Sequence, residues 1–261
     1  MISKFLWLLA AASLAAFSQP AAAEDIRVVV SGGFAAAYKE LSVAFEKRTQ
    51  HRLITGWGAS MGSTPTAIPV RLERGEAIDV VIMAREGLEP LLAKGRVVPG
   101  SEADLVRSKI AMAVREGAPA PDISSVEALR RTLLNARSIA YSDSASGVYL
   151  SGDLFKRLGI DQQIAGKSRM IHGTPVGETV ARGEAEIGFQ QYSELLPVKG
   201  IRIVGLIPEE TQKVTVFAAG VTTNAKAPVG ARALIEFLAS PDAYSAIRAS
   251  GLEPAGEPRA E

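Results

Sequence analysis

The sequence predicts an α/β fold built around a largely parallel sheet. Strand-like segments alternate with helix-like segments along most of the chain. The chain contains 47% hydrophobic residues, which is enough to bury a sizeable core. It contains no internal repeat, low-complexity tract or long linker. Its length of 261 residues therefore suits one large domain or two modest ones.

The N-terminal segment has the pattern of a secretory signal. Lys4 precedes an apolar run from Phe5 to Phe17, and Ala21 and Ala23 are the small residues expected before a cleavage site. The apolar run is too short to span a bilayer comfortably, so an anchored helix is the less favoured alternative. We therefore expect a signal peptide over residues 1–23 and no membrane insertion of the mature chain.

Charge and cysteine content exclude several classes of function. The residues that follow the signal carry 28 basic and 28 acidic side chains, a balance that argues against nucleic acid or an anionic membrane as a partner. The chain has no Cys, which rules out disulfides, thiol nucleophiles and thiolate metal sites. An exported protein without disulfides fits a bacterial periplasm. Because only two His residues are present, we expect neither a metal site nor a cofactor.

The individual elements follow from β-branched runs and from apolar residues at helical spacing. Phe34, Tyr38, Leu41 and Phe45, for example, recur at intervals of three and four. Strands are predicted at residues 26–30, 52–58, 78–84, 109–114, 138–142, 169–173, 186–190, 201–207 and 213–221. Helices are predicted at residues 34–49, 63–76, 147–159, 174–184 and 230–251, with a disordered tail at 253–261.

Small polar residues gather at four junctions where a predicted strand meets a predicted helix. The junctions read VSGGF, GASMGST, SDSASGVY and HGTPVGE, and they begin at Val30, Gly58, Ser142 and His172. Helix starts offer unpaired N–H groups to anions, and ligands of open α/β sheets bind beyond the carboxyl ends of the strands. One such junction is an ordinary helix cap. Four in one chain favour a shared anion site.

Familiar motifs do not explain these junctions. SGGFAA matches neither G-x-G-x-x-G nor the Gly-Lys-Ser/Thr of a phosphate loop, so a nucleotide site is not expected. Residues 58–62 match the G-x-S-x-G pattern of serine hydrolases. However, His172 is the one histidine placed to complete a triad, and Pro65 and Pro69 interrupt the helix that follows. A serine hydrolase is therefore the least favoured hypothesis.

Four longer segments, in this order, resemble the periplasmic molybdate-binding proteins of ABC transporters. They read VVVSGGFAAAYKEL, GASMGSTPTAIPVRLERGEAIDVVIMAR, YSDSASGVYLSGDLFKRLG and GEAEIGFQQYSELLPVKGIRIVGLIPEE. The resemblance implies the type 2 periplasmic-binding fold, in which two crossovers join two α/β lobes and a ligand binds in the cleft between them. Lobe one would comprise residues 24–107 and 215–261, and lobe two residues 108–214. A monomer is expected.

The sequence also departs from the molybdate-binding pattern. Gly32-Gly33 stands where molybdate binders have Ala-Ala-Ser, the segment 59–63 replaces a shorter serine run, and Gln191 replaces a tyrosine. His172 begins the loop that would supply a backbone amide. These differences predict a larger pocket for an organic anion. They resemble the aconitate isomerases, which share SGGFxAAYK and GFQQxSEL and interconvert trans- and cis-aconitate on this fold.

The isomerase resemblance implies carboxylate clamps and groups that move a proton. We favour His172 for proton transfer, because its reference pKa of about 6.5 suits a base near neutral pH, and Tyr149 as an acid. Glu178 and Glu194 are less favoured, since a carboxylate that faces a triply charged substrate is repelled. The residues expected to bind substrate are Ser31, Gly32, Gly33, Ser60, Met61, Gly62, Ser63, Arg85, Ser146, Gly173, Thr174, Gln190 and Gln191.

The alternative function is that of a solute-binding protein for an ABC transporter. Such a protein would bind molybdate or an organic carboxylate without chemistry and would dock on a permease. It would share the fold and most of the site residues. For Trp57 and Met61, packing is favoured over a role in the site.

Overall fold

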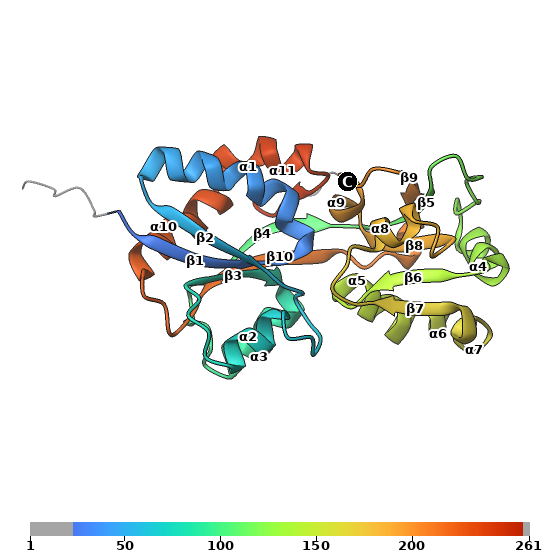
Figure 1. Cartoon of the computed structure of the whole chain (residues 1–261), viewed down its shortest axis with the longest axis horizontal. Coiled ribbons are helices and arrows are strands. Elements are labelled where there is room, and N and C mark those ends of the chain that lie inside the picture. The colour runs from blue at the N-terminus through green and yellow to red at the C-terminus, as the bar shows by residue number, and fades with distance from the viewer. Residues whose placement is uncertain (1–22, 258–261) are drawn as a thin grey trace, which may run out of the picture.

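The computed structural model describes residues 23–257, so the predicted signal peptide lies outside the described residues except for Ala23. Two β-sheets lie side by side along the long axis of the molecule, with helices packed around each of them (Figure 1). The predicted α/β class is confirmed. Among the described residues, no helix is both long enough and apolar enough to cross a membrane.

The described strands divide into a six-stranded and a five-stranded sheet. The first sheet has the order β11-β4-β10-β3-β1-β2 and contains β1 (Asp25–Val30), β2 (Arg52–Trp57), β3 (Val80–Ala84), β4 (Ala103–Ser108), β10 (Thr215–Val221) and β11 (Glu253–Pro254). The second has the order β7-β6-β8-β5-β9 and contains β5 (Ile110–Arg115), β6 (Ile139–Ser142), β7 (Ser168–Ile171), β8 (Ile187–Gln191) and β9 (Ile201–Leu206).

The helices follow the same division. Around the first sheet are α1 (Gly32–Thr49), α2 (Ile68–Glu73), α3 (Arg85–Ala93), α10 (Pro228–Ala239) and α11 (Tyr244–Ala249). Around the second are α4 (Val126–Asn135), α5 (Ala145–Tyr149), α6 (Phe155–Arg157), α7 (Asp161–Ile164), α8 (Val176–Ala181) and α9 (Tyr192–Leu195).

Both sheets are mixed, so the prediction of a largely parallel sheet was wrong. The β1–β2, β1–β3, β6–β7 and β6–β8 pairs are parallel, as strand–helix–strand units require. β10 runs antiparallel to β3 and β4, and β5 runs antiparallel to β8 and β9. The antiparallel strands arise where the chain crosses from one sheet to the other, between β4 and β5 and again between β9 and β10. The exact lobe boundaries remain a prediction.

Alternation of side chains along β1 builds the two layers of the first core. Val28 and Val30 pack with Phe34 on the face that α1, α10 and α11 cover. Val29 packs with Leu72 and Leu88 on the opposite face, under α2 and α3. Figure 1 shows these helices on opposite sides of the first sheet. The rigid layers fix the carboxyl ends of β1 and β2, which face the second sheet.

The second sheet repeats this construction on β5. Met112 packs with Leu129 and Phe155 on the face covered by α4 and α6. Ala111 and Ala113 pack with Leu195 of α9 on the other face. Their small side chains let α9 lie close to the strand, directly beside the first sheet's α1.

Three sequence predictions needed correction at the C-terminal end and in the middle of the chain. The helix predicted over residues 230–251 is divided into α10 and α11, because Pro241 cannot continue a helical hydrogen-bond ladder. Residues 253–257 are ordered: β11 pairs with β4, and the Arg107 guanidinium donates to the carbonyls of Pro254, Ala255 and Glu257. The prediction also omitted β4, α3, α4, α7 and α9.

Candidate functional site

A cavity of about 320 Å³ lies between the two sheets. Its residues come from the carboxyl ends of the parallel strands or from the segments that follow them, which is where open α/β folds bind ligands. All four polar junctions of the sequence contribute to it. The first wall consists of Gly32, Trp57, Gly58, Ala59, Thr64 and Thr66, and the second wall consists of Ser142, Asp143, Ser144, Gly173, Thr174, Pro175, Gln190 and Glu194.

The first wall offers neutral donors. Gly32 is the first residue of the 18-residue helix α1, whose initial N–H groups and dipole favour an anion. Thr64 and Thr66 add hydroxyl groups. Neither Lys nor Arg occurs among the described residues that line the cavity. Lys39 lies outside the lining, with its Nζ 5.7 Å from the ring centroid of Trp57.

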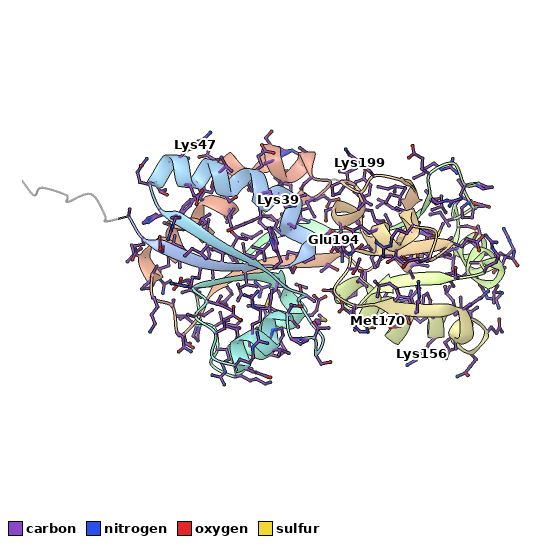
Figure 2. All side chains as sticks on the ribbon, viewed as in Figure 1. Lys39, Lys47, Lys156, Met170, Glu194 and Lys199 are labelled. Carbon is purple, nitrogen blue, oxygen red and sulfur yellow. The ribbon has the colours of Figure 1, made fainter. Side chains whose placement is uncertain are left out.

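The second wall carries two carboxyl groups, those of Asp143 and Glu194. Asp143 Oδ2 lies 3.1 Å from Nδ1 of His172. Glu194 lies in the middle of the molecule, where the two sheets meet (Figure 2), and its Oε1 accepts a 2.9 Å hydrogen bond from Nε2 of Gln190. Desolvation raises the pKa of Glu194 to about 7, and the negative charge of Asp143 acts in the same direction.

Four of the predicted binding residues line the cavity: Gly32, Gly173, Thr174 and Gln190. His172 is outside the lining, and its side chain is 60% exposed, but its hydrogen bond to Asp143 connects it to the second wall. Its catalytic role remains a prediction.

Tyr149 is placed differently. It is buried outside the lining, and its hydroxyl donates a 2.7 Å hydrogen bond to the carbonyl of Thr211. Its burial raises the pKa of the phenol. The hydrogen bond to Thr211 occupies the Tyr149 hydroxyl. Tyr149 is not part of the cavity lining, and its role as an acid remains a prediction.

In the serine-rich segment after β2, both the backbone N–H and the hydroxyl of Ser60 are engaged in hydrogen bonds. Ser60 is fully buried, its Oγ accepts from the backbone N–H of Ala84, and its own N–H donates to Oγ of Ser144. The Ser60 contact therefore ties the first wall to the second. Met61, Gly62 and Ser63 do not line the cavity.

The remaining predicted binding residues also lie outside the lining. Arg85 is paired with Asp104, with 2.6 Å between Nε and Oδ1. Ser146 shares a hydrogen bond with Ser142, which does line the cavity. Gln191 is buried and donates to Thr215. Ser31 and Gly33 complete this group, and Ser31 Oγ is buried without a hydrogen-bond partner among the described residues.

The sequence predicts that the two glycines at the start of α1 help to enlarge the pocket, and the structure shows which side chains lie against them. A Cβ on Gly33 would lie 2.1 Å from the ring of Phe217, so this space is filled by the core. A Cβ on Gly32 would lie 2.0 Å from Oε1 of Glu194. Gly32 therefore makes room for a carboxyl group of the protein itself.

Sequence reasoning missed Asp143 and gave Glu194 too little weight. Asp143 is part of the SDSASG junction, so its position alone could have drawn attention to it. Glu194 follows Gln190 by four residues, but nothing local in the sequence indicates that it reaches Gly32, which lies 162 positions earlier. No cluster of three or more His, Asp or Glu side chains that could hold a metal occurs among residues 23–257.

The chain is similar to several known proteins in sequence and in fold. Residues 26–253 match the family model described as bacterial extracellular solute-binding protein. An aconitate isomerase of a Pseudomonas species is 51% identical over 229 residues, which cover 88% of this chain and 87% of that protein. A molybdate-binding protein of Azotobacter vinelandii is 26% identical, over 96% of this chain and 97% of that protein.

A solved structure agrees. The periplasmic molybdate-binding protein of Azotobacter vinelandii superposes with a TM-score of 0.72 at 21% identity, covering 90% of this chain and 100% of that one. The predicted fold and family resemblance are thus confirmed, and the family description indicates an extracellular or periplasmic location. The chain belongs to the bacterial extracellular solute-binding protein family, and within that family it is a relative of an aconitate isomerase.

Proposed function

We propose that this protein is an aconitate isomerase, which interconverts trans- and cis-aconitate by an allylic proton shift. The observation that carries the proposal is the 51% identity to an aconitate isomerase over 88% of the chain. The cavity supports it, because neutral donors on one wall face ionisable groups on the other. Carboxylate binding requires the former and proton transfer requires the latter.

The reaction needs only acid–base chemistry. A base removes a proton from the methylene carbon, and the electron pair spreads over the adjacent double bond and carboxylate. A proton then returns to the carbon at the other end of the allyl system. The double bond has moved by one position, and the bound conformation determines whether it is cis or trans.

The predicted residues that line the cavity are the proposed substrate contacts. The backbone at Gly32 and the Gly173–Thr174 segment would hold carboxylates, and Gln190 would contact the substrate from the second wall. His172 would act through Asp143, which holds its Nδ1 and leaves Nε2 as the free ring nitrogen.

The organisation of the mature protein forms part of the proposal. Residues 1–23 would direct export to the periplasm and be removed. The first lobe would comprise residues 24–107 and 215–261, and the second residues 108–214. The functional unit would be a monomer that binds a small carboxylate anion.

Incubation of the purified protein with trans-aconitate in D₂O tests the function directly. We expect NMR spectra to show cis-aconitate appearing, with deuterium at the methylene carbon of those molecules whose abstracted proton exchanges with D₂O before a proton is returned. If neither isomerisation nor exchange occurs, the proposed function is wrong.

The second candidate is a solute receptor for molybdate or an organic carboxylate. The observation that favours it is the similarity to molybdate-binding proteins, which is weaker at 26% identity. Calorimetry with molybdate, tungstate, sulfate and aconitate distinguishes the two: tight molybdate binding without turnover of aconitate would support the receptor.

A further inference from the structure

We propose that Glu194 carries the proton in this reaction, taking it from the methylene carbon of bound aconitate and returning it to the other end of the allyl system. This inference rests on the proposed isomerase function. Under this proposal, Glu194 is the base in place of His172. It is argued from the position of Glu194, from the groups that hold its carboxyl and from the chemistry that a single carboxyl can perform.

Glu194 reaches the cavity because the opposite wall makes room for it. The residue belongs to α9 on the second sheet and lines the cavity. Its carboxyl extends to the start of α1 on the first sheet, where any side chain at position 32 would collide with Oε1. Ser193, its neighbour, donates a 2.8 Å hydrogen bond to the carbonyl of Gly33 and fixes α9 against α1. The carboxyl therefore stands where the two walls meet.

The orientation of Gln190 determines which oxygen of Glu194 is occupied. Oε1 of Gln190 accepts a 2.9 Å hydrogen bond from the backbone N–H of Val176, which can only donate. The amino group of Gln190 must then face Glu194, where it donates to Oε1. This bond fixes the position of Oε1 beside Gly32, where the two walls meet.

The surroundings of Glu194 give it the base strength that the reaction requires. Desolvation is the largest influence and raises its pKa to about 7, whereas the hydrogen bonds from Gln190 and from the backbone of Gln191 lower it. Asp143 is the charged group that raises the pKa further. A carboxylate of this pKa is a stronger base than an ordinary one, and it holds the proton loosely enough to release it near neutral pH.

One carboxyl group completes the cycle without a co-reactant. In the first step the C–H bond of the methylene carbon breaks, an O–H bond forms on Glu194, and the electron pair enters the allyl–carboxylate system. In the second step the O–H bond breaks and a C–H bond forms at the former vinyl carbon. Glu194 is again a carboxylate, and the atoms and charges balance.

His172 is less well placed for the same steps. Its side chain is 60% exposed and is absent from the lining, and its Nδ1 is engaged by Asp143. His172 is therefore assigned as a positioning residue that acts through Asp143. The Asp143 charge in turn faces Glu194 across the second wall.

The variant Glu194→Gln tests the proposal, with Glu178→Gln as the matched control. Glu178 lies on the surface of α8 in an ion pair with Arg182, outside the cavity. We expect Glu194→Gln to lower kcat about 10³-fold and to abolish deuterium exchange while it still binds trans-aconitate in calorimetry. Glu178→Gln should retain wild-type turnover. His172→Gln should lower kcat by less than Glu194→Gln does.

Each result has a defined meaning. An active wild-type enzyme whose Glu194→Gln variant keeps kcat within tenfold would overturn the assignment of Glu194 and leave the isomerase function standing. A wild-type protein without turnover would overturn the isomerase function itself, and the assignment with it. A larger loss of kcat in His172→Gln than in Glu194→Gln would assign the proton transfer to His172 instead.

The variant Gly32→Ala provides a second test that keeps the carboxyl. Its methyl group would displace Oε1 of Glu194 from its present position, so we expect at least a 10²-fold loss of kcat in a protein that unfolds at the wild-type temperature. This variant decides the matter if Glu194→Gln fails to fold. Wild-type turnover in Gly32→Ala would contradict the proposed placement of Glu194.

Discussion

The two walls of the cavity are both built from strand ends, but they differ in charge. Every residue of the first wall is neutral, and the second wall holds both carboxyl groups and the contact to His172. The first wall can therefore bind carboxylates without changing its protonation. The second can exchange protons. Under the proposed function, the difference assigns acid–base chemistry to one half of the binding fold and carboxylate binding to the other.

The largest effect is expected from removing the charge of Glu194, measured as the free energy of unfolding. The pKa of this group is raised in the folded protein to about 7, so the stability that it contributes is present below its ordinary pKa and is lost as the pH rises through 7. Glu194→Gln does not titrate. We expect it to gain roughly 2 kcal/mol relative to the wild type between pH 5 and pH 8.5.

Denaturant unfolding of the two ligand-free proteins at both pH values measures this difference. The two proteins differ at position 194 alone, so the contributions of the other ionisable groups largely cancel in the comparison. If the free energies of unfolding of the wild type and Glu194→Gln differ by the same amount at pH 5 and at pH 8.5, Glu194 is as well solvated as a surface carboxylate.

A second prediction concerns the coupling within the second wall. Asp143→Asn removes the negative charge that raises the pKa of Glu194, so Glu194 becomes a weaker base. We expect kcat to fall about tenfold and the pH profile of kcat to move to lower pH. A merely structural role for Asp143 would lower kcat without moving the profile.

Tyr149 provides a comparison outside both walls. Tyr149→Phe removes the hydrogen bond to the Thr211 carbonyl and leaves that acceptor buried, which should cost about 1 kcal/mol of stability. Thermal unfolding measures this loss. Turnover should remain close to that of the wild type, and a loss of 10²-fold would support the predicted role of Tyr149 as an acid.

The smallest effect is expected on the first wall. Thr66→Val keeps the shape of the side chain and removes one hydroxyl, so it should raise KM about threefold and leave kcat unchanged. Initial rates over a range of trans-aconitate concentrations separate the two constants. A fall in kcat alone would show that the division between the walls is incomplete.

Much of the fold could be predicted from the sequence, because strand and helix patterns are local. The four polar junctions also indicated where the cavity would be, since each follows directly from a strand end. The antiparallel direction of β5 and β10 was missed because it depends on which sheet the chain enters next, and no local pattern records that.

The site was predictable only in part, for the same reason. Gly32 and Gly33 look alike in sequence, but one faces a carboxyl group and the other an aromatic ring. Both partners come from distant segments. The raised pKa of Glu194 likewise depends on burial between two sheets, so a carboxylate that appeared unsuitable beside an anionic substrate is suited to receive its proton.

The hydrogen bond from Ser193 to the Gly33 carbonyl joins α9 to α1 directly beside Glu194. Ser193 is buried, so water does not compete for this bond. The two walls are therefore held together next to the carboxyl, and Glu194 keeps its place against the start of α1.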